Sequence, residues 1–232
     1  MLQLETECLY GESFEIVQIE NNLCYGTLLT DQYKGWLNFN DLGEIPEANY
    51  RVLSIRAIIN EKNDVKSRTV TYLPLGSQIH VVSEEGDWFK IFLGFKDFKF
   101  GYAFKNNLIQ ISRKTLDWVS AAESLINTPY KWGGRNSIGI DCSALVQLSL
   151  QTAGINIGRN SSEQKLFKKL RLTDLDKSKR GDLIFWDGHV GIITNKKQMV
   201  HANAFKMMVS IETTKDVIKR TKESYEIFRI SY

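Results

Sequence analysis

One cysteine of this chain stands where a nucleophile can be activated. Cys142 lies in the run G-I-D-C-S-A-L-V at the start of a predicted apolar helix, and Asp141 before it is a residue type that caps helices. A helix N-terminus offers unpaired N–H groups and the positive end of the helix dipole, and both favour a thiolate. A lone cysteine is also compatible with a buried structural role, so Cys142 needs partners to count as catalytic.

Two of the three histidines supply such partners. His189 opens the run H-V-G-I-I-T, and His201 lies twelve residues later in M-V-H-A-N. Adjacent antiparallel strands over these runs would bring the two imidazoles together. The pattern favours nucleophilic catalysis, with Cys142 attacking, His189 as general base and His201 orienting that base. A zinc site of the same three residues is the alternative chemistry, but it lacks short ligand spacing and an obvious fourth ligand.

Two helices and a set of strands are expected to position these residues. Residues 143–153 form an apolar stretch that stops at Gly154, which predicts a buried helix. Residues 115–126 predict a second helix, capped by Thr115, with one apolar face made of Leu116, Val119, Ala122, Leu125 and Ile126. Strand-like runs follow at 183–186, 189–194, 198–203 and 208–212. Helices followed by strands indicate an α+β arrangement.

The first half of the chain contains a diffuse internal repeat. Residues 9–42 and 74–108 share a glycine, an alternating strand pattern, a polar turn and a closing Gly-Trp or Gly-Tyr pair. Each copy predicts a small antiparallel barrel of short strands. The first copy is short at its N-terminus, because it lacks the opening strand that residues 50–59 provide for the second.

Composition and charge exclude several classes of protein. Of the 232 residues, 43% are hydrophobic and 25% charged, which is ordinary for a folded chain. The net charge of +3 is too small to indicate a nucleic-acid partner. Three widely spaced cysteines form no disulfide framework and favour a reducing compartment. The start of the chain is acidic, which is not typical of a signal peptide, and no apolar run is long enough to span a membrane. We therefore expect a cytoplasmic location.

Five sequence blocks resemble one known family. They are T-P-Y-x-W-G-G, D-C-S-x-L-V-Q, R-G-D-L-I-F-W, G-H-V-G-I and H-A-N, in this order. Residues 112–232 closely resemble the NlpC/P60 cysteine peptidases, which are papain-like enzymes that cleave peptidoglycan peptides. The two repeat copies resemble bacterial SH3 domains, over residues 1–45 and 46–111. The fold implied is α+β, with two N-terminal SH3-like β-barrels followed by a papain-like catalytic domain.

The resemblance assigns roles to particular residues. Cys142 matches the nucleophile, His189 the general base and His201 the polar third member. Tyr130 matches a tyrosine whose hydroxyl lies by the nucleophile. Asp141, Ser143, Asn160 and Ser161 match positions that contact substrate or line its cleft, and Asn160 stands where the family pattern has an acid.

Two first-barrel positions complete the implied binding site. Glu12 and Tyr33 match residues that close one end of the cleft in a subgroup, the γ-D-glutamyl-L-diamino acid endopeptidases. A blocked end selects short peptides with a free N-terminus, and an acidic Glu12 would pair with the terminal ammonium. Residues 1–45 hold eight acidic side chains and one basic side chain, which agrees with this role. For both residues a purely structural role in the barrel is the alternative.

The function expected is hydrolysis of the γ-D-glutamyl–L-diamino acid bond in short murein peptides with an N-terminal L-Ala, in peptidoglycan recycling. No metal and no organic cofactor is expected. An exported cell-wall hydrolase with wall-binding SH3 domains is the first alternative. An inactive murein-binding module is disfavoured by the intact set Cys142, His189 and His201. An acyltransferase or amidase on the same scaffold is disfavoured by the T-P-Y-x-W-G-G and R-G-D-L blocks.

Overall fold

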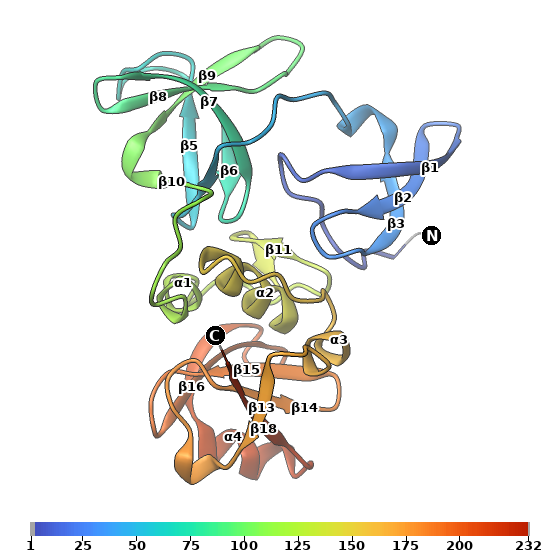
Figure 1. The fold of residues 1–232 in the computed structure, drawn as a ribbon, viewed down its shortest axis with the longest axis vertical. Coiled ribbons are helices and arrows are strands. Elements are labelled where there is room, and N and C mark those ends of the chain that lie inside the picture. The colour runs from blue at the N-terminus through green and yellow to red at the C-terminus, as the bar shows by residue number, and fades with distance from the viewer. Residues whose placement is uncertain (1–2, 232) are drawn as a thin grey trace. The chain divides into compact units, whose positions relative to one another are not determined.

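The structure is a computed structural model that describes residues 3–231, and it forms two compact units. One unit is Cys8–Lys114, and the other joins the chain up to Glu7 with the chain from Thr115 onward (Figure 1). Strands dominate both units, and the α-helices of the described part of the chain all lie beyond Thr115. This division differs from the boundaries predicted from the sequence, which place the first residues with the N-terminal repeat.

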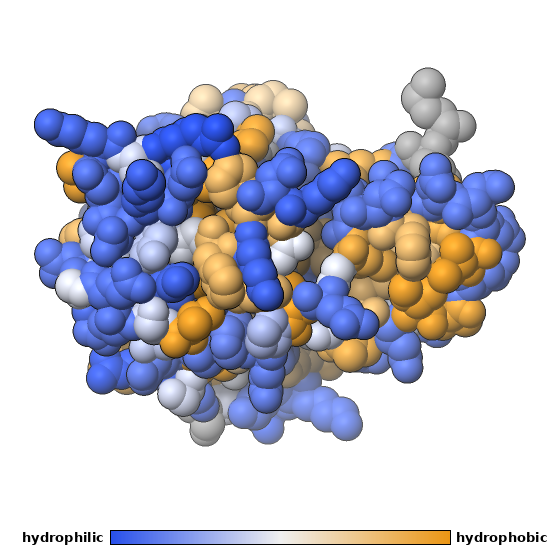
Figure 2. All heavy atoms as spheres, turned by 90° about the horizontal axis from the view of Figure 1, so that it is seen from above, coloured by the Kyte–Doolittle hydropathy of each residue, from blue (hydrophilic) through white to orange (hydrophobic). Residues whose placement is uncertain are grey.

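A three-stranded antiparallel sheet opens the unit Cys8–Lys114. Its strands, in spatial order, are β1 (Phe14–Glu20), β2 (Leu23–Leu28) and β3 (Lys34–Asn38). A 3-10 turn over Phe39–Asp41 follows. Apolar side chains gather on the surface of this sheet, where Figure 2 shows orange atoms; exposed members are Ile16, Val17, Ile19, Trp36 and Phe39.

A seven-stranded sheet completes this unit. Its strands are β4 (Tyr50–Val52), β5 (Arg56–Asn60), β6 (Thr69–Pro74), β7 (Gln78–Glu85), β8 (Trp88–Phe92), β9 (Phe100–Phe104) and β10 (Leu108–Gln110). A 3-10 turn over Lys105–Asn107 precedes β10. The seven strands pair in the order β10-β4-β7-β8-β9-β5-β6 around a buried apolar core. Within residues 3–231 the strand pairings close neither sheet into the barrels predicted from the repeat, and an SH3-like assignment stays a prediction.

The second unit is built on a six-stranded antiparallel sheet. The strands are β13 (Leu170–Thr173), β14 (Leu183–Trp186), β15 (His189–Ile193), β16 (Gln198–Asn203), β17 (Met208–Thr213) and β18 (Glu226–Ile230), in the order β13-β18-β14-β15-β16-β17. The helices are α1 (Val119–Ser124), α2 (Cys142–Thr152), α3 (Ser161–Lys165) and α4 (Thr214–Thr221). A small hairpin of β11 (Arg135–Asn136) and β12 (Gly139–Ile140) precedes α2, and a 3-10 turn over Leu175–Lys177 precedes β14.

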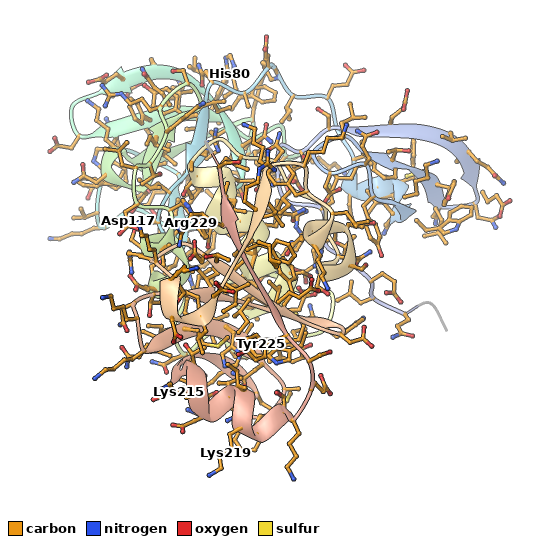
Figure 3. The ribbon with its side chains drawn as sticks, turned by 60° about the horizontal axis from the view of Figure 1, so that its bottom comes forward. His80, Asp117, Lys215, Lys219, Tyr225 and Arg229 are labelled. Atoms are coloured by element: carbon orange, nitrogen blue, oxygen red, sulfur yellow. The ribbon has the colours of Figure 1, made fainter. Side chains whose placement is uncertain are left out.

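Helices cover both faces of this sheet. α1 and α2 pack together, and α2 contacts β15 and β16 from one side. α4 lies on the opposite side (Figure 1), where Val217 joins Ile184 and Trp186 in an apolar cluster. Lys215 and Lys219 lie on the exposed face of α4 (Figure 3). The sheet is therefore the middle of three layers, and its strands run between two apolar surfaces.

The helix and strand predictions in this unit differ in their success. α2 and the strands β14 to β17 lie where the apolar patterns predict them. The helix predicted over residues 115–126 is shorter and covers only Val119–Ser124. Thr115 does not cap it, because its hydroxyl and its N–H both donate to the carbonyl of Thr152. Leu116 and Ile126, which were predicted on the apolar face, are exposed, whereas Val119, Ala122 and Leu125 are buried as predicted.

Candidate active site

Cys142 is the first residue of α2, and its side chain is buried. Asp141 occupies the N-cap position, and one carboxylate oxygen accepts a hydrogen bond from the Ala144 N–H at 2.8 Å. The whole of α2 is buried, including its polar side chains Gln147, Ser149 and Gln151. The Cys142 sulfur accepts hydrogen bonds from the backbone N–H groups of Ser143 and Val190. The contact with Val190 places the nucleophile candidate beside the start of β15.

The thiol of Cys142 is not activated in the resting structure. Burial, followed by the negative charge of Asp141, raises the pKa of Cys142 to about 11. The N–H groups of Val190 and Ser143 and the positive charge of Arg159 act in the opposite direction. Burial outweighs the helix-terminus effect, so the thiolate expected from the sequence gives way to a neutral thiol. Such a thiol needs a base that removes its proton as it attacks.

His189 and His201 form a hydrogen-bonded pair. His189 is the first residue of β15, and His201 lies on the neighbouring antiparallel strand β16. The distance from His189 Nε2 to His201 Nδ1 is 2.9 Å. Burial, then the neighbouring charges of His201 and Arg220, lowers the pKa of His189 to about 3, so its imidazole is neutral at pH 7. The prediction that adjacent strands bring the two rings together is confirmed.

A carboxylate that sequence reasoning missed lies beyond His201. Glu212 of β17 has its Oε2 atom 3.0 Å from His201 Nε2. Arg220 of α4 donates to both Glu212 oxygens, at 2.8 and 3.3 Å, and the Lys206 ammonium lies 3.7 Å from Oε1. The Glu212 and His201 side chains are 8% and 1% exposed. A continuous hydrogen-bonded row therefore runs from His189 through His201 and Glu212 to Arg220.

Tyr130 lies within electrostatic reach of Cys142. Burial, followed by the negative charges of Cys142 in its ionised form and of Asp141, raises the pKa of Tyr130 to about 12, so its hydroxyl keeps its proton. The strand-like segment at Tyr130 forms a bridge with Ile140, just before the cap of α2. A protonated phenol near the nucleophile can donate a hydrogen bond to an oxyanion that forms there.

Asp141 and Ser143 belong to a buried polar network. The Arg159 guanidinium donates to both Asp141 oxygens, at 2.9 and 2.6 Å, and to the Ser143 hydroxyl at 2.8 Å. Asp141 also accepts from the Ser143 hydroxyl and from the Gly133 N–H. Arg159 and Asp141 are 1% and 8% exposed. Protein donors thus occupy both Asp141 oxygens, and the carboxylate organises the loops around Cys142.

The N-terminal arm of the unit belongs to this framework. The Thr6 hydroxyl accepts from Arg159 Nε at 2.8 Å. Glu7 accepts from the Lys131 ammonium at 2.7 Å, from the Arg135 N–H at 2.8 Å and from the Asn136 amide at 2.6 Å. Gly133 has a positive φ, and a Cβ there would approach the Leu4 carbonyl to 2.9 Å. The T-P-Y-x-W-G-G block, which contains Gly133, therefore fits the arm closely, which explains why residues up to Glu7 join this unit.

The remaining predicted binding residues lie in two places. Asn160 is exposed and caps α3 in a reciprocal arrangement with Glu163, and Ser161 is half-buried in the first turn of that helix. Glu12 and Tyr33 belong to the unit Cys8–Lys114. There the Glu12 carboxylate accepts the Leu9 N–H at 2.8 Å. The roles of these residues toward substrate stay predictions.

The alternative zinc chemistry has no matching ligand cluster. Within residues 3–231, no group of three or more His, Cys, Asp or Glu side chains is arranged to hold a metal ion. His189 Nε2 and His201 Nδ1 bond to each other, and His201 Nε2 bonds to Glu212.

Among residues 3–231, no helix has the length and apolar character needed to cross a membrane.

Comparisons with known proteins agree with this geometry. The chain is 25% identical to dipeptidyl-peptidase 6 of Lysinibacillus sphaericus, over 87% of this chain and 80% of that protein. It is 21% identical to the γ-D-glutamyl-L-lysine dipeptidyl-peptidase of Bacillus subtilis, over 93% of this chain and 77% of that protein. A shorter match, 33% identical over 37% of this chain and 22% of the relative, is to the peptidoglycan DL-endopeptidase CwlO of Bacillus licheniformis.

A solved structure shares the fold. An NlpC/P60 family protein from Bacillus cereus superposes with a TM-score of 0.83 and 19% sequence identity, over 97% of this chain and 82% of that one. Residues 127–225 match the NlpC/P60 family and contain Cys142, His189 and His201. The part of the chain that carries the candidate active site is therefore similar to the NlpC/P60 family.

Proposed function

We propose that this chain is a cysteine peptidase that cleaves the γ-D-glutamyl–L-diamino acid bond of short murein peptides with a free N-terminal L-Ala. One observation carries the proposal: Cys142, at the start of α2, is hydrogen-bonded by the residue that follows His189, and His189 is hydrogen-bonded to His201. A nucleophile, a base and a residue that orients the base are the parts that acyl transfer requires.

The proposed reaction proceeds through a thioester. The Cys142 thiol gives its proton to His189 while the sulfur attacks the γ-carbonyl carbon of D-Glu. The C–N bond then breaks, and His189 returns the proton to the leaving amine of the diamino acid. Water attacks the thioester with His189 again as base, which releases the dipeptide and restores the thiol. Tyr130 is the proposed donor to the oxyanion, because burial and nearby negative charges keep its phenol protonated.

The names of two relatives support the substrate class. Dipeptidyl-peptidase 6 and the γ-D-glutamyl-L-lysine dipeptidyl-peptidase match both units of this chain and not the peptidase part alone. Dipeptidyl-peptidases need a means of measuring the distance from the substrate's N-terminus. We assign that task to Glu12, assisted by Tyr33, as the partner of the L-Ala ammonium. Asp141 is a weaker candidate, because protein donors occupy its oxygens.

Murein recycling is the proposed setting. In intact peptidoglycan the amine of L-Ala is acylated by the sugar, so a free L-Ala marks a fragment already released from the wall. The sequence has three widely spaced cysteines and no disulfide framework, which supports a reducing compartment, and we propose the cytoplasm.

Mass spectrometry of digests tests this proposal. The substrates are free L-Ala-γ-D-Glu-L-Lys, its meso-diaminopimelate analogue, the N-acetylated form of each peptide, and intact sacculi. We expect release of L-Ala-D-Glu from the free peptides and little cleavage of the others. Preferential digestion of sacculi would favour the alternative of a wall-acting hydrolase.

The role of Glu12 is tested with the same peptides. Glu12→Gln should lower kcat/KM for the free peptide by roughly tenfold to a hundredfold, because a charge-assisted hydrogen bond is lost. The N-acetylated peptide offers no cation, so its slow cleavage should change little. Equal losses with both peptides would show a structural effect instead.

A further inference from the structure

We propose that Glu212 is a positioning residue that fixes which nitrogen of His201 carries the proton and, through His201, sets His189 as a base. This inference rests on the proposed function of Cys142 and His189. It begins with the hydrogen-bonded row of β15, β16 and β17, in which each ring nitrogen of His201 has one partner: Nδ1 lies 2.9 Å from His189 Nε2, and Nε2 lies 3.0 Å from Glu212 Oε2.

The charge state of Glu212 is set by its surroundings. Its carboxylate faces Arg220 of α4 at 2.8 Å, Lys206 of the β16–β17 turn at 3.7 Å and His201 of β16 at 3.0 Å. The Arg220 guanidinium is in turn stacked 4.1 Å above the centre of the Phe205 ring. Burial pushes the pKa of Glu212 up, but hydrogen bonds from Arg220 and His201 outweigh it and lower the pKa to about 2. Glu212 is therefore an ionised carboxylate, which accepts hydrogen bonds and donates none.

Because Glu212 can only accept a hydrogen bond, the His201 nitrogen that faces it, Nε2, must carry a proton. Burial, the largest influence on His201, lowers its pKa although Glu212 acts against this, so the ring is neutral at pH 7 and carries one N–H. Glu212 can only accept, so that N–H must be at Nε2. His201 Nδ1 is then a lone pair, and it accepts a hydrogen bond from His189.

The tautomer of His201 in turn fixes the tautomer of His189, the proposed base. His189 is also neutral, and its Nε2 must carry the proton that it donates to His201 Nδ1. The other ring nitrogen, Nδ1, is left with a lone pair, which is the form that a general base needs. When His189 takes the Cys142 proton on Nδ1, the positive charge of the imidazolium is stabilised through His201 by the Glu212 carboxylate. Because Glu212 and His201 are 8% and 1% exposed, water screens this interaction little.

The fold explains how Glu212 reaches this position. Glu212 is paired in register with Met199 of β16, two residues before His201 on the same strand. Met199 packs in the apolar cluster under α4, and α4 also carries Arg220. One face of the hairpin β16–β17 thus presents both the histidine and the carboxylate, and α4 supplies the cation that keeps the carboxylate ionised.

Removal of the negative charge should reverse the hydrogen-bond direction in part of the molecules. In Glu212→Gln the amide can donate to His201 Nε2, which moves the His201 proton to Nδ1 and the His189 proton to Nδ1 as well. A protonated Nδ1 cannot take the thiol proton. We expect kcat to fall about tenfold to a hundredfold, with KM changed by no more than about twofold, because the amide can still present its oxygen in the remaining molecules.

Nitrogen NMR of the full chain labelled with 15N-histidine tests the proposal directly. The chain has only three histidines, and His80→Gln identifies the signal that belongs to neither His189 nor His201. In the wild type at pH 7 we expect both His189 and His201 as neutral rings protonated at Nε2. In Glu212→Gln we expect a second tautomer protonated at Nδ1. Glu123→Gln is the control, because Glu123 also pairs with an arginine, Arg180, at 2.7 Å in the same unit but is 30% exposed and touches neither histidine.

The outcomes separate this proposal from the proposed function. A wild-type His201 protonated at Nδ1 would overturn the proposal. So would a Glu212→Gln variant with the wild-type tautomers, whether its kcat is unchanged or falls together with its thermal stability. The NMR measurement needs no substrate, so it still decides the role of Glu212 if no murein peptide is cleaved and the proposed function fails.

Discussion

Arg159→Met should destabilise the catalytic unit far more than loss of an exposed arginine. Arg159 makes four hydrogen bonds, to both oxygens of Asp141, to Ser143 and to Thr6, and its side chain is 1% exposed. The variant leaves the Asp141 carboxylate 8% exposed, with only the Ser143 hydroxyl and the N–H groups of Gly133 and Ala144. Breaking a buried pair by removing one partner costs about 3–5 kcal/mol, a large part of a typical total stability.

Arg180→Met is the matched control in the same unit. Arg180 also pairs with two carboxylates, of Asp117 and Glu123, but its side chain is 36% exposed. Exposed pairs contribute about 0–1 kcal/mol. Asp141→Asn combined with Arg159→Met should recover about 1 kcal/mol or more, because Asn keeps the helix cap and removes the unpaired charge.

These differences in the free energy of unfolding are measured in urea, with hydrogen exchange of the α2 amides as the probe. α2 belongs to the catalytic unit alone, so the probe reports on that unit. The expected order of stability is wild type, Arg180→Met, the double variant and Arg159→Met. An Arg159→Met variant no less stable than Arg180→Met would refute the reasoning that this network holds the loops around the nucleophile.

Two further predictions concern the catalytic residues. His189→Ala should lower kcat/KM as severely as Cys142→Ala, and His201→Ala should be milder, because the base moves the proton whereas His201 only orients it; a His201 variant more damaged than the His189 variant would contradict these roles. Alkylation of Cys142 by iodoacetamide should be slow at pH 7 and rise toward pH 11, because a thiol whose pKa is raised to about 11 is ionised in only about one molecule in ten thousand at pH 7. Mass spectrometry of the labelled peptide measures the alkylation rate at each pH. A rate that reaches its plateau near neutral pH would instead indicate a thiolate in the resting enzyme.

Local pattern was sufficient for the elements that carry Cys142 and the histidines. α2 carries apolar residues on a helical pattern and is followed within two residues by Gly154, so its position follows from sequence alone. The strands of His189 and His201 are short and follow each other closely along the chain, and their antiparallel pairing places the rings together. Residues on the two adjacent strands of a hairpin can be predicted to meet because little chain separates them.

Contacts that depend on register or on distant segments were beyond the sequence. Glu212 reaches His201 because of the β16–β17 register, and Arg220 reaches Glu212 because α4 folds back under the sheet. The N-terminal turn predicted for α1 does not form, because Thr115 instead bonds to the carbonyl of Thr152 at the end of α2. These two residues are far apart in the sequence, so the bond could not be predicted. The neutral thiol of Cys142 reflects burial, a tertiary property that outweighs the local effect of the helix terminus.

The most direct measurement of the central claim is kcat/KM of the full chain and its Cys142→Ala variant toward free L-Ala-γ-D-Glu-L-Lys, with product identified by mass spectrometry. Cys8→Ser and Cys24→Ser are the matched controls, since they alter the other two cysteines of the chain. The account predicts release of L-Ala-D-Glu by the wild type and by both controls, and a loss of about a thousandfold or more in Cys142→Ala. A wild type that leaves the peptide intact, or a Cys142→Ala variant that keeps more than about a tenth of the activity, would contradict it.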